Sequence, residues 1–202
     1  MFTAEVLLGR LSFQVFAPVV ISCVSATVIS RAFFGNHVTF LTPAYVLESP
    51  IELLLYAVLG ISTGIIGAAF IKFYFGTARR FKRLSIPGWM KPAIGGLLVG
   101  FIGLYSRNIM GVGYGTIMSI LDESLIGWTL LGLVGLKILA TSLTLGSGGA
   151  GGLFVPSLFI GASLGGFLGW TVQLFFPSIV PAPSHYAMVG LAAMLSPTIP
   201  AP

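Results

Sequence analysis

Residues 146–156 read Gly-Ser-Gly-Gly-Ala-Gly-Gly-Leu-Phe-Val-Pro. The glycine-rich part of this stretch, residues 146–152, separates two long apolar runs, Leu125–Leu145 and Leu153–Phe176. Glycine allows tight turns and lets the backbone approach a ligand closely. The stretch therefore predicts a break between two helices, with the second helix beginning at Leu153.

The composition of the whole chain indicates whether its surface faces water or lipid. Of the 202 residues, 56% are hydrophobic and 7% are charged, whereas about a quarter of a typical soluble domain is charged. From Ile138 to Pro202 there is no Asp, Glu, Lys or Arg. The apolar runs are long and continuous, which favours helices over the alternating strands of a barrel. The sequence therefore predicts an all-α integral membrane protein of the plasma or cytoplasmic membrane, with the lipid bilayer as its partner.

The predicted segments differ widely in length. Their ranges are Leu11–Ser30, Leu53–Phe75, Pro92–Tyr105, a short and re-entrant segment over 111–123, Leu125–Leu145, Leu153–Phe176 and Tyr186–Leu195. Unequal, tilted and glycine-interrupted helices are typical of channels and transporters, because broken helices at membrane depth occur where they line a cavity or are buried in protein. We expect residues 1–202 to form a single transmembrane region without a soluble domain.

The net charge of +5 has a local origin. Its main cluster comprises Arg79, Arg80, Lys82, Arg83 and Lys91, between two apolar runs. Such a cluster beside membrane spans is typical of a cytoplasmic loop. The sequence thus favours a membrane topology signal over nucleic-acid binding.

The helix predicted to begin at Leu153 is a candidate anion site. The first N–H groups of a helix have no intrahelical acceptor, and the helix dipole adds about half a positive charge there. At membrane depth a small anion satisfies these donors without a charged side chain. No Lys or Arg lies nearby in the sequence, which fits transport, because a fixed cation would hold the anion too tightly for release.

Three other interpretations of this stretch remain open. Gly146, Gly148 and Gly151 match the dinucleotide-binding fingerprint, but the acidic residue expected about 20 positions later is missing. An intramembrane serine hydrolase would pair Ser147 with His185, although no third residue or oxyanion hole accompanies them. In the third interpretation the glycines only pack helices together. A separate hypothesis for the whole chain is a structural or orphan fragment that has no activity alone.

The segment Gly152-Leu153-Phe154-Val155-Pro156 resembles the G-[K/I/L]-F-x-P signature of the CLC family of voltage-gated chloride channels and chloride/proton antiporters. The similarity extends over the whole chain, through Ala4–Val6, Gly111–Tyr114, Lys137–Thr141, Gly146–Gly149, Leu158–Ala162 and Gly190–Leu195. The resemblance implies part of an inverted-repeat architecture, and a homodimer with one anion path per subunit. It implies chloride transport rather than catalysis, with chloride as the transported ligand and no cofactor or metal. The chloride-binding residues that it implies are Gly151, Gly152, Leu153, Phe154, Val155 and Pro156, with the backbone amides of Leu153 and Phe154 as donors.

The sequence also departs from the family pattern. The G-S-G-x-P and G-[R/K]-E-G-P motifs of the family are not found in this chain. The tyrosine that contacts chloride in the family is expected beyond Pro202. We therefore expect a fragment that carries one wall of the pore. Proton-coupled members often place a glutamate immediately after the position that Glu5 matches, and here Val6 occupies it. Valine cannot relay protons, which favours passive conduction over antiport. Glu5 itself also fits an interfacial carboxylate paired with Arg10.

Overall fold

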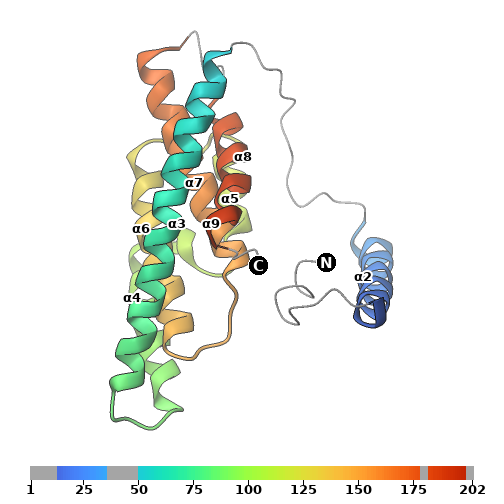
Figure 1. Cartoon of the computed structure of the whole chain (residues 1–202), viewed down its shortest axis with the longest axis vertical. Helices are drawn as coiled ribbons and strands as arrows, with labels where there is room; N and C mark the ends of the chain where they lie inside the picture. Colours follow the sequence, from blue (N-terminus) through green and yellow to red (C-terminus); the bar gives the residue numbers. More distant parts are fainter. Residues whose placement is uncertain (1–12, 36–49, 178–181, 199–202) are drawn as a thin grey trace. The chain divides into compact units, whose positions relative to one another are not determined.

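The computed structural model describes residues 13–35, 50–177 and 182–198, and in these ranges all regular structure is helical (Figure 1). The helices are α2 (Phe13–Phe34), α3 (Ile51–Arg83), α4 (Met90–Tyr105), the 3-10 helix η1 (Arg107–Ile109), α5 (Tyr114–Leu121), α6 (Trp128–Gly146), α7 (Phe154–Phe175), α8 (Pro183–Ala193) and α9 (Leu195–Thr198). The all-α prediction is confirmed.

The chain divides into two compact units, residues 1–41 with 202, and residues 42–201. In the first unit the described element is α2, an uncharged apolar helix up to Arg31 in its last turn. All other described helices belong to the second unit, which also contains the glycine break.

Helix lengths vary as the sequence predicts. Among the described helices, four are long and apolar enough to cross a membrane, namely α2 from Ala17 onward, α3, α6 and α7. Helix α4 has 16 residues and α5 has 8. At 1.5 Å per residue, α5 is far too short to cross a hydrocarbon core about 30 Å thick. The protein is a membrane protein built from helices of unequal length.

The basic cluster is helical, and the loop prediction for it was wrong. Helix α3 continues through Arg79, Arg80, Lys82 and Arg83 to the end of its 33 residues, and Lys91 lies in the first turn of α4. Lysine and arginine are good helix formers, and cations in a last turn interact favourably with the helix dipole. A helix of 33 residues is about 50 Å long, so its basic end extends beyond the apolar stretch.

The core of the second unit lies where α3, α6, α7 and α8 meet (Figure 1). Its buried side chains are Leu59, Phe70, Val134, Ile160, Leu164, Tyr186 and Met194. The ring of Tyr186 on α8 packs against the ring of Tyr56 on α3, with 5.0 Å between centroids. These contacts hold α7 among its neighbours and thereby fix the position of its first turn.

Helices α7 and α8 approach each other closely. Gly161, Gly165 and Gly169 recur every four residues and form one face of α7, and α8 packs on this face. A Cβ atom added at Gly165 would collide with the Tyr186 carbonyl oxygen, and one added at Gly161 would collide with that of Gly190. Small residues at this spacing allow helix backbones to pack closely in lipid.

Candidate functional site

The glycine break begins with a well-defined helix end. Gly148 has φ +92°, its N–H donates to Leu145 O at 3.1 Å, and the N–H of Gly149 donates to Thr144 O at 2.9 Å. This pair of bonds is the Schellman motif, which satisfies the last carbonyl groups of a helix. The prediction that the chain breaks here is confirmed, because α6 ends at Gly146 and α7 begins at Phe154.

The first turn of α7 has no side-chain cap. Leu153 is the N-cap residue, and its side chain makes no capping hydrogen bond. The N–H of Ser157 donates to Leu153 O at 3.0 Å, and Pro156 has no N–H. Helix geometry directs the N–H groups before Pro156 back toward the glycine loop, together with the positive end of the helix dipole.

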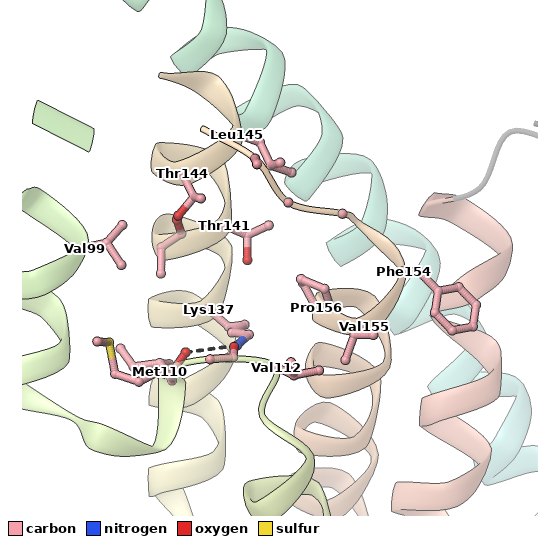
Figure 2. Close-up of a pocket in the computed structure, with 16 residues that line it drawn as sticks. Val99, Met110, Val112, Lys137, Thr141, Thr144, Leu145, Phe154, Val155 and Pro156 are labelled. Atoms are coloured by element: carbon pink, nitrogen blue, oxygen red, sulfur yellow. Dashed lines mark hydrogen bonds between the residues drawn. The ribbon is translucent and has the colours of Figure 1, made fainter. Parts of the chain in front are cut away.

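A cavity of about 520 Å³ adjoins this helix start (Figure 2). Its lining combines four segments: Val99 of α4, the loop around Gly111, one face of α6, and residues 150–156 without Leu153. The predicted site residues in this lining are Gly151, Gly152, Phe154, Val155 and Pro156. The side chain of Leu153 instead packs against the buried core, so Leu153 could reach the cavity only through its backbone.

Lys137 on α6 also lines the cavity, and its side chain is 3% exposed. Its Nζ donates to Ile109 O at 2.9 Å and to Gly111 O at 3.0 Å (Figure 2). The same atom lies 4.8 Å from the centroid of the Phe159 ring, within the range of a cation–π contact. No Lys or Arg lies near the α7 start in the sequence, but the packing of α6 against α7 brings Lys137 to the same cavity.

Thr141 and Thr144 share this lining with Lys137. The hydroxyl of Thr144 donates to Ala140 O at 2.8 Å, which leaves its oxygen able to accept. Sequence reasoning assigned no function to these three residues, although a signal was present. Lys137 is the lone charge in its span, and the two threonines follow at i+4 and i+7 on one helix face. Ionisable residues within membrane spans are usually functional.

The structure does not bring Ser147 and His185 together. The Ser147 hydroxyl donates to Thr144 O at 3.0 Å at the end of α6, next to Gly95 of α4. His185 lies in the first turn of α8, beside Pro183, which contacts Gly169 in the second half of α7. Phe154 and Gly169 are about 22 Å apart along α7, so the two residues of the predicted hydrolase pair lie toward opposite ends of that helix.

Of two further predictions, the structure argues against one, and the other concerns residues that it does not describe. The dinucleotide-binding fingerprint requires a strand before its first glycine, but in the described chain α6 precedes Gly146. Glu5 and Val6, the predicted positions of an intracellular proton path, lie outside the described residues.

Comparisons with known proteins agree with the resemblance seen in the sequence. The sequence model of the family described as "Voltage gated chloride channel" matches residues 1–202. A chloride channel protein described as ClcB-like, from Ralstonia nicotianae, is 32% identical over 201 residues, which cover 100% of this chain and 47% of that protein.

Two more relatives extend the comparison. The voltage-gated ClC-type chloride channel ClcB of Escherichia coli O17:K52:H18 is 32% identical over 206 residues, which cover 100% of this chain and 49% of that protein. The chloride channel protein CLC-f of Arabidopsis thaliana is 33% identical over 195 residues, which cover 89% of this chain and 25% of that protein. The chain spans about half the length of these bacterial relatives.

Proposed function

The chain belongs to the voltage-gated chloride channel family, and from this premise we propose that it carries an anion-binding segment of a transmembrane chloride pathway. The binding segment is residues 151–156, with the backbone amides at the start of α7 as donors. The observation that carries the proposal is the position of the start of α7, whose residues Gly151, Gly152 and Phe154–Pro156 line a cavity of about 520 Å³.

Binding by backbone amides suits a transported anion. Helix N-terminal N–H groups present dipoles rather than a full charge, so they attract an anion. Conduction also requires that the anion leaves again, which excludes very tight sites. Two of the residues beside the donors, Gly151 and Gly152, have no side chain that would block an approaching ion.

We further propose passive conduction, in a homodimer, rather than proton-coupled antiport. Val6 stands where proton-coupled members often carry a glutamate, and its side chain has no group that titrates. The distinction is tested in liposomes by recording external pH during chloride efflux. Passive conduction predicts no proton counterflow, whereas proton movement in fixed proportion to chloride would establish antiport.

Substituting Gly152 tests the site itself. A Cβ atom added at Gly152 meets nothing within 4 Å, and the same holds at Gly135 on α6, away from the cavity lining. Gly152→Leu should therefore fold and place an apolar side chain over the anion donors. Gly135→Leu adds the same side chain elsewhere and serves as the matched control.

The measurement is chloride efflux from liposomes that contain the protein at its natural length. We expect efflux to fall about tenfold or more in Gly152→Leu, equivalent to about 1.4 kcal/mol, and to be unchanged in Gly135→Leu. Equal efflux in both variants would contradict the site assignment. An unmodified protein that passes no chloride would contradict the transport function.

A further inference from the structure

Within the described part of the chain, the contacts found for the buried Lys137 ammonium group are with neutral groups. Its ammonium group donates to the carbonyl oxygens of Ile109 and Gly111 and lies over the ring of Phe159. Carbonyl dipoles and an aromatic ring attract a cation, but neither supplies a negative charge. These contacts alone leave the net charge of Lys137 uncompensated.

No carboxylate in the described ranges pairs with Lys137. These ranges contain three acidic residues, and two of them bond elsewhere: the Tyr56 hydroxyl donates to the Glu52 carboxylate, and Ser184 donates to that of Glu123. The third, Asp122, is exposed at the C-terminal end of α5. Buried charges in proteins are normally paired or ligated, because an isolated ion in a low-dielectric region is very costly.

The surroundings of Lys137 suggest where its counter-charge lies. The residue lines the same cavity as Gly152, Val155 and Pro156 at the start of α7. The positive end of the α7 dipole and a lysine ammonium group thus adjoin one space of about 520 Å³. Two independent positive features at one cavity favour an anionic occupant.

We propose that the anion in this cavity is the counter-charge of Lys137, and that Lys137 is a positioning residue that raises anion affinity electrostatically. This inference rests on the proposed chloride function and adds a side-chain charge to the amide site.

The hydrogen bonds of Lys137 explain how the lysine can attract an anion without preventing the anion from leaving the cavity. Two of its three N–H donors already bond to Ile109 O and Gly111 O, and the Phe159 ring lies beside the same nitrogen. The lysine therefore supplies positive potential while two of its donors stay bonded to protein groups. An anion attracted in this way keeps the weaker amide donors as its direct partners, which suits permeation. The same bonds hold the segment between α4 and α5 against α6.

The experiment separates the charge of Lys137 from its hydrogen bonds. Lys137→Gln removes the charge and keeps two N–H donors, on a side chain one bond shorter than that of lysine. Lys137→Met removes both. Lys72→Gln removes the same charge from an exposed position on α3 and is the matched control. Chloride binding to each purified protein of natural length, in detergent, is measured by titration calorimetry.

Hydrogen exchange of residues 106–113 provides a second measurement on the same proteins. We expect Lys137→Gln to weaken chloride binding about tenfold, from the loss of one nearby unit charge in a partly screened site. Exchange over 106–113 should stay near the unmodified level in this variant. Lys137→Met should weaken binding as much and also speed the exchange, and Lys72→Gln should change neither.

Each outcome decides between the possibilities. Unchanged chloride affinity in Lys137→Gln overturns the inference. Weakened affinity that appears only together with faster hydrogen exchange of residues 106–113 also overturns it, because Lys137 then acts only by holding this segment in place. If the unmodified protein binds chloride in a Lys137-dependent way but passes none through liposomes, the transport proposal fails and this inference stands. If the unmodified protein binds no chloride, both are overturned.

Discussion

Gly148 illustrates how one residue shapes the site. Its φ of +92° ends α6 and turns the chain into the loop that lines the cavity. In this conformation the Cβ atom of an L-residue crowds the neighbouring carbonyl oxygen. The loop after α6 therefore depends on a glycine at this position and not merely on a flexible composition.

Gly148→Ala should lower the free energy of unfolding by about 1 kcal/mol, because alanine is strained at positive φ. Gly148→Asn should cost less, since asparagine tolerates the left-handed region better. Thermal unfolding in detergent measures both. Gly96→Ala, where a Cβ atom meets nothing within 4 Å in the middle of α4, is the control and should not destabilise. Equal stability of Gly148→Ala and the unmodified protein would contradict this account of the turn.

At the scale of the element, α7 connects the site to the core. Its first turn presents the amide donors, and its glycine face packs against α8. Displacement of α8 would shift the helix that carries these donors. Packing between α7 and α8 is therefore a condition for the geometry of the cavity, although no residue of α8 lines it.

Gly165→Ala tests this packing. The added Cβ atom would collide with the Tyr186 carbonyl oxygen, which is backbone and cannot rotate away. Overpacking of this kind costs about 1–3 kcal/mol, and we expect a corresponding fall in melting temperature. Gly132→Ala on α6 is the control, because its Cβ atom meets nothing within 4 Å. The packing account fails if the two variants melt at the same temperature.

At the scale of the molecule, folding and ligand binding are linked. A ligand that binds only the folded state stabilises it in proportion to the logarithm of its concentration above Kd. The cavity and its lining belong entirely to the unit of residues 42–201. Anion binding should therefore stabilise this unit against unfolding.

Replacing gluconate with chloride at constant ionic strength should raise the melting temperature of the protein. At 100 times Kd the stabilisation is about 2.7 kcal/mol. The rise should be absent in Gly152→Leu and retained in Gly135→Leu, which are the blocked and control variants proposed above. A rise of the same size in all three proteins would indicate a general salt effect rather than a site.

Composition and local pattern were enough to predict the lipid environment, the helical class, the break at Gly146–Gly152 and the family. These features depend on composition, on continuous apolar runs and on glycines that are adjacent in the chain. The helical conformation of residues 79–83 was not predicted, because their positive charge indicates a cytoplasmic loop while their high helix propensity was not considered.

The residues that surround the start of α7 could be identified only in the folded protein. Lys137 precedes Gly152 by 15 residues and bonds to carbonyl groups 26 and 28 residues before it in the chain. Its side chain reaches the cavity only because α6 packs against α7 and the segment from Ile109 to Gly111 lies against α6 and lines the same cavity. Local sequence patterns record helices and turns, but the side chains that share a cavity follow from how helices pack, which depends on contacts between residues distant in the chain.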